Sequence, residues 1–453
     1  MVFSRASVNL RYRFNHAGAL AALCLGLIAT TTHAEQDEAP DFAGRTMSGN
    51  WGGVREAGWR SGWLWDAELK VDTLHNRGGR SSGSRTMSNL DLRMKADLSR
   101  IADWAGATAY VHVLDNRGSG INARHTGSLM GVSNIEVTTP TTRIFHAWLQ
   151  QNLLNDQLTL LGGLYPIDSE FFVMDSASAL LHPSYGTPAN LGLTHDPSIF
   201  NNSAFGVRLK WQSPQRTLYA QGALLDGVPN DPVHPKRTDI RFAKGDGAFG
   251  IAEVGWMPME AGHVFEPLEP VDTLRPPALV AHEKYEGTSK YAVGFWRYGN
   301  RVPDRFDVDA GGEALRRHSQ GAYLLAERTL FGLGDAGRDL TAFGRYSFSD
   351  GYATAIDRNW NIGLRVRGPL SSRPDDQFLI GWTSGRLAPG FRATRAASGI
   401  ETASAEDQLE ITWRAALSRW LTAQPNVQII RNPEGDSANK RATVVGLRLE
   451  LVL

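Results

Sequence analysis

Charged side chains recur at every second position in several stretches of this chain, and apolar residues fill the positions between them. Residues 89–98, NLDLRMKADL, carry Asp91, Arg93, Lys95 and Asp97 in this way. Guanidinium, ammonium and carboxylate groups hydrogen-bond to hydroxyl groups, so a row of them offers many weak contacts to a small polar solute. The chemistry that this row could do is transient binding, because weak contacts let a solute leave again.

The same arrangement elsewhere in the chain yields a set of charged residues that share a face with one another. The candidates for contact with a solute are Asp91, Arg93, Lys95, Asp97, Arg208, Lys210, Arg345, Arg365, Arg367, Glu410, Arg414 and Arg448. We expect most of them to pair with opposite charges on a neighbouring strand. We expect a subset to reach the narrowest part of the solute's path. Arg365 and Arg367 could address one solute together, because Cα atoms two positions apart on a strand are separated by about 7 Å.

Two strings that resemble enzyme motifs do not have the context that their chemistry needs. GRSSG (79–83) fits a nucleophile elbow but lies in a Gly/Ser-rich stretch, where no strand-to-helix turn is expected. GLGDAG (332–337) fits a dinucleotide fingerprint but precedes a strand, LTAFGRYSF, instead of opening a helix. The 12 histidines show no HExxH or similar ligand spacing. We therefore expect no catalytic residue, no metal site and no cofactor.

The elements that position the charged residues are predicted to be strands. Residues two apart share a face of a strand, whereas on a helix they point to nearly opposite sides. The pattern of NLDLRMKADL recurs in AFGVRLKWQ (204–212), NWNIGLRVRG (359–368), DQLEITWRAAL (407–417) and the last residues of the chain. Less regular copies lie near 64–73, 143–151, 158–165, 217–225, 290–298, 321–329 and 340–348. Most segments are about ten residues long, which suits a tilted strand that crosses a membrane.

The connections between these segments alternate between short and long. Short ones lie at 100–105, 154–156, 214–216, 369–375 and 418–421, and long ones at 76–86, 116–142, 166–202, 228–246, 299–318, 386–406 and 432–440. This rhythm predicts an all-β fold, a transmembrane antiparallel β-barrel of about sixteen strands with both termini at the short-turn end. The Pro- and Glu-rich segment 258–288 is long where a short turn is expected, so we interpret it as an insertion. A soluble β-sandwich or solenoid also alternates and stays the competing fold.

The first 34 residues have the pattern of a secretory signal. Three arginines precede the apolar run AGALAALCLGLIATT, which ends in THA before Glu35. Removal of residues 1–34 would take away the single cysteine, Cys24, and leave a slightly acidic chain, which argues against a nucleic-acid partner. After Ala34 no apolar run is long enough for a spanning helix. The expected organisation is a signal peptide (1–34), an N-terminal periplasmic segment with a short helix (35–61) and an outer-membrane barrel (62–453).

An ordered set of motifs resembles the OprB-type carbohydrate-selective porins of Gram-negative outer membranes. It includes SGNWGGVR (48–55), NLDLRMKADL, TRIFHAWLQQNLLNDQLTLLGGL (142–164), SYGTPANLG (184–192), RPDDQFLIGWTSGRL (373–387) and EDQLEITWRAALSRWLTAQPNVQIIRNPEGD (406–436). The resemblance covers almost all of the chain after the signal. It implies a sixteen-stranded barrel in the outer membrane, preceded by a short periplasmic helix that matches GGVREAGW (52–59).

The function implied by the resemblance is passive diffusion of monosaccharides and similar small polyhydroxylated solutes. A general or anion-tolerant porin, for instance for sugar acids, is the first alternative, because the candidate residues lean basic. A secreted carbohydrate-binding or carbohydrate-active protein is the second. The expected partners are outer-membrane lipid and lipopolysaccharide, small sugars or sugar acids, and the barrel-assembly machinery. A homo-oligomer stays open as a further expectation.

Overall fold

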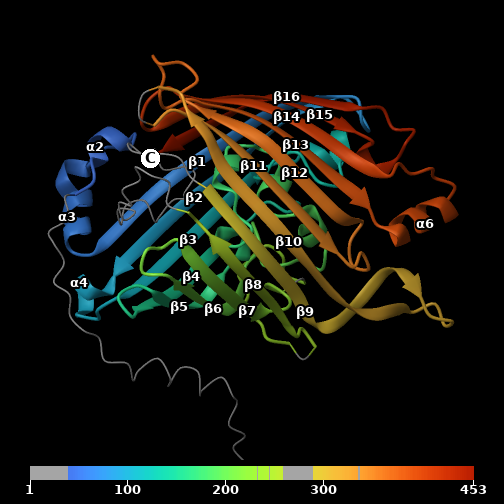
Figure 1. The fold of residues 1–453 in the computed structure, drawn as a ribbon, viewed down its shortest axis with the longest axis horizontal. Coiled ribbons are helices and arrows are strands. Elements are labelled where there is room, and N and C mark those ends of the chain that lie inside the picture. The colour runs from blue at the N-terminus through green and yellow to red at the C-terminus, as the bar shows by residue number, and fades with distance from the viewer. Residues whose placement is uncertain (1–38, 232, 244, 259–288, 335–336) are drawn as a thin grey trace, which may run out of the picture. The chain divides into compact units, whose positions relative to one another are not determined.

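The computed structural model describes residues 39–231, 233–243, 245–258, 289–334 and 337–453. Within these ranges sixteen antiparallel strands follow one another in chain order, and β1 pairs with β16 to close a barrel (Figure 1). The predicted antiparallel barrel of about sixteen strands is therefore confirmed. The predicted signal, residues 1–34, and nearly all of the 258–288 insertion lie outside the described residues.

The strands differ in length. They are β1 (Trp63–Arg77), β2 (Gly83–Asp97), β3 (Ala107–Gly118), β4 (Thr142–Leu153), β5 (Leu158–Tyr165), β6 (Ala204–Gln212), β7 (Leu218–Asp226), β8 (Ala248–Trp256), β9 (Ser289–Val308), β10 (Ala314–Gly332), β11 (Asp339–Ser349), β12 (Ile356–Arg367), β13 (Gln377–Leu387), β14 (Ala405–Ala416), β15 (Leu421–Arg431) and β16 (Ala442–Val452).

The helical elements of the described residues are short. The α-helices are α2 (Phe42–Arg45), α3 (Val54–Arg60), α4 (Leu98–Ala102), α5 (Ala189–Gly192) and α6 (Pro389–Ala397). The other helical turns are η1 (Trp51–Gly53), η2 (Asn122–Thr126), η3 (Ile167–Ser169), η4 (Asp175–Ala177), η5 (Pro183–Tyr185) and η8 (Pro433–Gly435). None of these helices has the length and apolar character needed to cross a membrane. The expected short helix before the first strand is α3.

The two faces of the sheet follow the predicted alternation. On β2, the side chains of Leu92 and Met94 are 46% and 40% exposed on the outer face, whereas Asp91 and Arg93 are buried on the inner face. The tryptophans Trp211, Trp360 and Trp382 are likewise exposed on the outside. On β2 the apolar positions thus face outward, and the charged positions face the inside of the barrel.

The barrel has two distinct ends. The end that carries Leu453, α3 and the short connections, called the turn end, lies opposite the end that carries α6 and the long connections, called the loop end (Figure 1). Leu453 donates its backbone N–H to the carbonyl of Ala67 at 2.8 Å, which continues the pairing of β1 with β16. Arg55 of α3 donates to the carbonyl of Leu453 at 2.7 Å, so the N-terminal segment is tied to the end of the chain.

Two of the predicted long connections are wrong. Strands β9 and β10 continue as a hairpin through most of 299–318, and only residues 309–313 connect them. Asp309 stabilises this turn by accepting hydrogen bonds from the N–H groups of Gly311 and Glu313 at 2.8 and 3.0 Å. Strands β1 and β2 similarly leave only residues 78–82 between them, where a connection over 76–86 was expected. In both places the polar, Gly-rich sequence extends the strands, because each strand has a neighbouring strand with which to pair.

The two longest described connections fold into the barrel. Residues 119–141, here called the first inner loop, follow β3, and residues 166–203, here called the second inner loop, follow β5. The second inner loop places Phe171, Phe172 and Leu180 in one buried cluster with wall residues such as Tyr323 and Phe343. Apolar loop residues bury themselves against apolar patches of the inner wall, and this burial supplies the core of the molecule.

Candidate functional site: the inner wall and its loops

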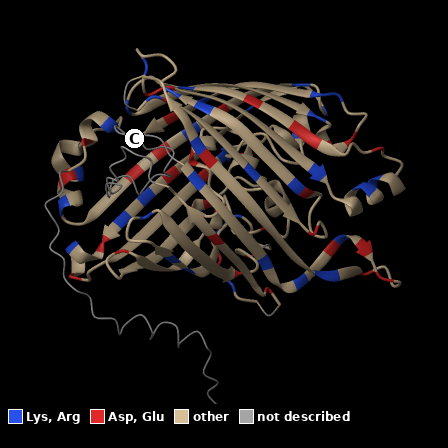
Figure 2. Ribbon diagram, in the orientation of Figure 1, with Lys and Arg blue, Asp and Glu red and all other residues tan. Residues whose placement is uncertain are grey.

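One group of charged side chains on the inner wall is bonded mainly within itself. This charged cluster consists of Asp66, Glu68 and Lys70 on β1, Asp91 and Arg93 on β2, and His112 on β3. Lys, Arg, Asp and Glu follow one another along β1 and β2 (Figure 2). The sheet register places Asp66 opposite Arg93, and Arg93 opposite His112, so the three strands bring the cluster together.

The hydrogen bonds of the charged cluster are short and charge-assisted. Arg93 donates from Nε to Asp66 at 2.8 Å and from Nη2 to Glu68 at 2.6 Å. His112 Nε2 lies 2.9 Å from a carboxylate oxygen of Asp91. Lys70 Nζ lies 3.7 Å from both Glu68 and Asp91. Three carboxylates against two permanent cations give the cluster an excess of negative charge, and the Lys70 side chain keeps 15% exposure.

Aromatic rings continue the cluster onto β4. Tyr110 lies 4.9 Å from Trp148 between ring centroids, and His112 stacks on His146 at 5.3 Å. The register of β3 and β4 shifts at this point, so that His112 pairs with His146 and Val113 pairs with Ile144. Phe145 is the extra residue of this bulge and contacts the ring of His112 at 5.5 Å. A bulge of this kind turns an additional side chain toward the inside.

Carboxylates elsewhere on the wall hold the backbone of the second inner loop. Glu253 accepts from the N–H of Phe172 at 2.8 Å, and Glu327 accepts from the N–H of Ser176 at 2.6 Å. Glu410 accepts from the consecutive N–H groups of Leu181 and His182 at 2.6 and 3.0 Å. Each bond gives a buried N–H group a carboxyl oxygen as its acceptor, which stabilises the loop against the wall.

The first inner loop is held in the same way. Glu406 accepts from the N–H groups of Leu129 and Met130 at 3.0 and 3.1 Å and from the hydroxyl of Ser128 at 2.6 Å. Gln428 donates to the carbonyl of Val132 at 3.0 Å. The wall therefore fixes both loops at several points.

Cations on the wall bind the carbonyl and carboxylate oxygens of the loops. Arg345 donates to the carbonyls of Phe172 and Gly186 at 2.7 and 2.9 Å and also to that of Ser184. Arg208 forms a bidentate pair with Glu170 of the second inner loop, at 2.8 and 2.9 Å.

Arg448 connects β16 to β1 and to the first inner loop. It binds Asp72 of β1 through two bonds of 2.7 and 2.8 Å and donates to the side-chain oxygen of Asn134 at 2.7 Å. The inner loops are thus bound by four residues that were predicted as solute contacts, namely Arg208, Arg345, Glu410 and Arg448.

The other predicted residues lie in different settings. Arg365 and Arg367 share Asp339, with N–O distances of 3.4 and 2.9 Å, near the turn end. Arg414 pairs with Glu450 at 2.8 Å. Arg365 and Arg367 lie on β12, away from the β1–β3 cluster, whereas Glu450 on β16 lies opposite Lys70 of that cluster in the sheet register.

Three predicted residues lie beside other groups. Asp97 accepts from the N–H of Ser99 at 3.0 Å and caps α4, whereas Lys95 lies half-buried on β2. Lys210 Nζ lies 5.8 Å from the centroid of the Tyr219 ring. Of the predicted set, Asp91 and Arg93 are the members that belong to the charged cluster.

Burial shifts the pKa of two groups in the second inner loop. It raises the pKa of the Asp168 carboxyl to about 6, against the opposing effect of its hydrogen bond from the N–H of Phe200 at 2.8 Å. It lowers the pKa of the His182 imidazole to about 3, so this ring is neutral at pH 7 and accepts from the N–H of Ser184 at 3.2 Å.

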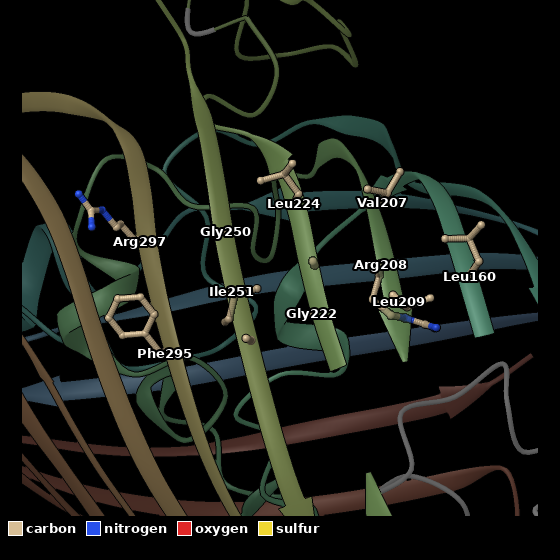
Figure 3. Close-up of a pocket in the computed structure, with 12 residues that line it drawn as sticks. Leu160, Val207, Arg208, Leu209, Gly222, Leu224, Gly250, Ile251, Phe295 and Arg297 are labelled. Carbon is tan, nitrogen blue, oxygen red and sulfur yellow. The ribbon is translucent and has the colours of Figure 1, made fainter. Parts of the chain in front are cut away.

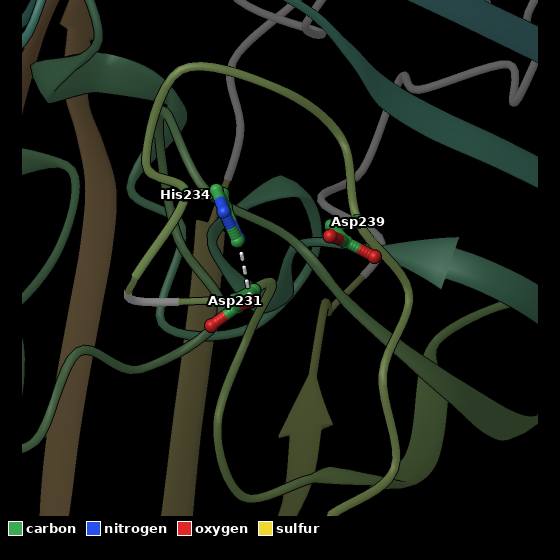
Figure 4. Close-up of side chains that lie close together, drawn as sticks. All are labelled: Asp231, His234 and Asp239. Carbon is green, nitrogen blue, oxygen red and sulfur yellow. Dashed lines mark hydrogen bonds and ion pairs between the residues drawn. The ribbon is translucent and has the colours of Figure 1, made fainter.

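A group of possible metal ligands lies in the connection between β7 and β8. Ligating atoms of Asp231, His234 and Asp239 come within 4.8 Å of one another (Figure 4). Asp231 already accepts from Nδ1 of His234 at 2.9 Å, and a nitrogen of Arg241 lies 3.4 Å from its other oxygen. Both carboxylate oxygens of Asp231, which a metal would need as ligands, therefore already have partners.

Residues 81–453 match the family model described as "Carbohydrate-selective porin, OprB family". The chain belongs to this family. It is also similar to "Porin B" of Pseudomonas aeruginosa, with 23% identity over 96% of each chain. In fold it resembles the high-pH structure of Pseudomonas putida OprB, with a TM-score of 0.77 and 18% identity over 92% of this chain and 100% of that one. The low-pH structure of that protein gives a TM-score of 0.56 and 15% identity over the same shares. This porin is accordingly a sixteen-stranded protein of a Gram-negative outer membrane, and it serves carbohydrate-selective diffusion.

Several residues of the porin interior escaped prediction. Lys70 and His112 follow from the register of β1 and β3 with β2, which the alternating pattern alone does not give. Glu253, Glu327 and Glu406 bind loop backbone that is distant in sequence, and a single carboxylate on a strand carries no sign of such a partner.

Proposed function

We propose that this porin lets monosaccharides and similar small polyhydroxylated solutes diffuse passively past the charged cluster of β1–β3. The observation that carries the proposal is the pairing within the cluster, where Asp91, Arg93 and His112 bond to other wall side chains and, among the described residues, to no loop backbone. Both inner loops are fastened to other parts of the wall. Donors and acceptors of both signs can exchange partners with sugar hydroxyls as the solute passes.

Neighbouring side chains support the same path. Tyr110, His146 and Trp148 place ring faces beside the cluster, and an apolar ring next to hydrogen-bonding groups matches the amphipathic surface of a sugar. Lys70 is the more accessible cation of the cluster, since its side chain is 15% exposed and that of Arg93 is 3% exposed. In this proposal a solute meets Lys70 first and then exchanges hydrogen bonds with Asp91 and Arg93 behind it, whereas Arg208, Arg345, Glu410 and Arg448 act by positioning the loops.

Liposome swelling with purified wild-type and variant protein tests this path. Arg93→Gln removes the bonds to Asp66 and Glu68, and we expect neutral-sugar swelling rates to change about fivefold, as a difference of about 1 kcal/mol implies. Arg93→Lys keeps the positive charge but loses the planar guanidinium that binds two carboxylates at once. Its swelling rate should therefore lie between those of the wild type and Arg93→Gln. The control is Arg328→Gln, on the outer face of β10. Equal rates for all four proteins, each shown to be folded by heat-modifiable migration, would contradict the path.

A second candidate function, passage of sugar acids, is favoured by Arg365 and Arg367. Both guanidinium groups contact the carboxylate of Asp339, so two positive charges lie close together on this part of the wall. We expect the double variant Arg365→Gln, Arg367→Gln to lose anion preference in dilute salt, with a smaller effect at high salt. Reversal potentials measure this preference. An unchanged reversal potential in dilute salt would show that the two arginines do not contribute to anion preference.

We also propose the processing and the partners of the chain. Residues 1–34 are removed as a signal, residues 35–61 lie in the periplasm, residues 62–453 form the barrel, and the mature protein begins at Glu35. Mass spectrometry of the mature protein tests the cleavage, and a retained Cys24 would contradict it. The barrel-assembly machinery and lipopolysaccharide are the proposed partners, a homo-oligomer is a further proposal, and the protein acts as a channel and not as an enzyme.

A further inference from the structure

Arg297 lies on the outer face of β9, where side chains meet lipid. Val293 and Phe295, at the alternate positions before it, are exposed on that face, whereas Ala292 and Trp296 are buried on the other. Within the described part of the chain, no group forms a hydrogen bond or an ion pair with the guanidinium of Arg297. An unpartnered guanidinium in the apolar band is costly, and an anionic headgroup at the membrane surface would offset that cost.

The position of Arg297 along β9 decides which surface it can reach. Tyr291 stacks on Trp256 at 5.6 Å near the turn end, and Arg297 lies six residues further along the same strand. At about 3.3 Å per residue and a tilt of about 40°, this separation raises it roughly 15 Å toward the loop end. A long arginine side chain extends further toward the headgroups. Because long loops of such barrels face outward, the guanidinium is directed toward the outer leaflet.

A groove begins at Arg297 and crosses the outer face from β9 toward β5 (Figure 3). It has a volume of about 440 Å³. Leu209, Leu224 and Phe295 project around it, and Gly222 and Gly250 leave its floor without side chains. A Cβ atom added at Gly250 would meet nothing closer than a methyl carbon of Leu224 at 3.9 Å.

We propose that this groove binds one acyl chain of a phosphorylated glycolipid of the outer leaflet, of the lipid A class, while Arg297 binds its phosphate. The apolar groove matches an acyl chain, and the unpartnered cation at its end matches an anionic headgroup. A second copy of this chain is a poorer match, since a stable protein interface needs about 1,200–2,000 Å² of complementary surface. The inference rests on the proposed orientation and lipopolysaccharide contact, and not on the solute.

Matched variants separate the groove from general effects of mutation. Arg297→Gln removes the cation, and Gly250→Leu fills the floor. The control for the first is Arg328→Gln, which removes an outer-face arginine near the turn end of β10. The control for the second is Gly344→Leu on the outer face of β11, where an added Cβ also meets only ordinary contacts, the nearest at 3.5 Å.

Native mass spectrometry of the full-length folded protein in detergent, titrated with diphosphorylated lipid A, gives the test. We expect one bound lipid for the wild type and both controls, and at least tenfold weaker binding for Arg297→Gln and Gly250→Leu. Dephosphorylated lipid A and phosphatidylglycerol should bind the wild type at least tenfold more weakly. Equal lipid A binding by all five proteins would overturn the proposal, and so would equal binding of all three lipids by the wild type. A wild-type dimer that is lost in Gly250→Leu would also overturn it, because the groove would then be a protein interface. Liposome swelling with sugars should stay at the wild-type rate in both groove variants. The two experiments therefore test the lipid site and the proposed solute path independently.

Discussion

Single carboxylates hold long loops in this porin, and Glu410 is the clearest example. It accepts from two consecutive loop N–H groups and from the side-chain amide of Asn426 at 2.6 Å. Replacing a buried acceptor of this kind leaves N–H groups unsatisfied at a cost of about 1–3 kcal/mol.

We therefore expect Glu410→Gln to raise hydrogen-exchange rates in residues 176–185 while the barrel strands keep their protection. Glu450→Gln, on the inner face of β16, is the control because Glu450 pairs with Arg414 instead of loop backbone. If residues 176–185 exchange at the wild-type rate in Glu410→Gln, the anchoring role of Glu410 is contradicted.

Asp168 makes one contribution to the pH dependence of the second inner loop. Its folded pKa of about 6 lies above the ordinary value of 3.8, so the neutral form is favoured in the folded loop. The contribution of Asp168 to loop stability is then largest below about pH 4 and is lost as the pH rises through 6, whereas His182, whose pKa is lowered from 6.5, destabilises the loop as the pH falls. The loss of the Asp168 contribution approaches about 3 kcal/mol, at about 1.4 kcal/mol for each pH unit between the two pKa values.

Hydrogen exchange of the loop between pH 4 and 8, corrected for intrinsic rates, measures this dependence. We expect the loop of Asp168→Asn to gain stability relative to the wild type as the pH rises from 4 to 8. A difference between the two proteins that stays constant over this range would contradict the assignment.

At the scale of elements, the lipid face of β2 offers a direct comparison between adjacent positions. Leu92 faces outward and Asp91 inward. Leu92→Arg should cost about 2–4 kcal/mol in the membrane and lower the folded fraction, whereas Asp91→Asn should leave folding nearly intact. Heat-modifiable migration on gels gives the folded fraction. Similar losses for the two variants would show that the two faces do not differ as described.

Strands were predictable from sequence because their alternation is local. β5 was predicted at 158–165 and lies there, and β11 extends one residue beyond its prediction at each end. The hairpin of β9 and β10 was missed because its polar residues pair with each other outside the apolar band. The bulge at Phe145 was also invisible, since one extra residue on β4 leaves no mark in composition. It changes which side chains face the inside of the barrel.

The candidate site was predicted only in part, for a reason of physics. Alternation tells which residues face inward, so the inward positions of Arg93 and Arg345 could be predicted alike. Their partners come from the folding of connections into the barrel. Arg345 meets carbonyls of the second inner loop, more than 150 residues away, whereas Arg93 meets the neighbouring strand. The sequence pattern of the two arginines is the same.

The whole molecule combines a lipid-facing outer surface, two fastened inner loops and a charged cluster that lies beside aromatic rings. The central claim is that this arrangement favours neutral polyhydroxylated solutes over charged solutes of equal size. Liposome-swelling rates of the wild-type protein across monosaccharides, sugar acids and amino acids of similar size test it most directly. We predict the highest rates for neutral monosaccharides and a decline for larger sugars. Equal rates for all solutes of one size, or faster entry of amino acids than of monosaccharides, would contradict the account.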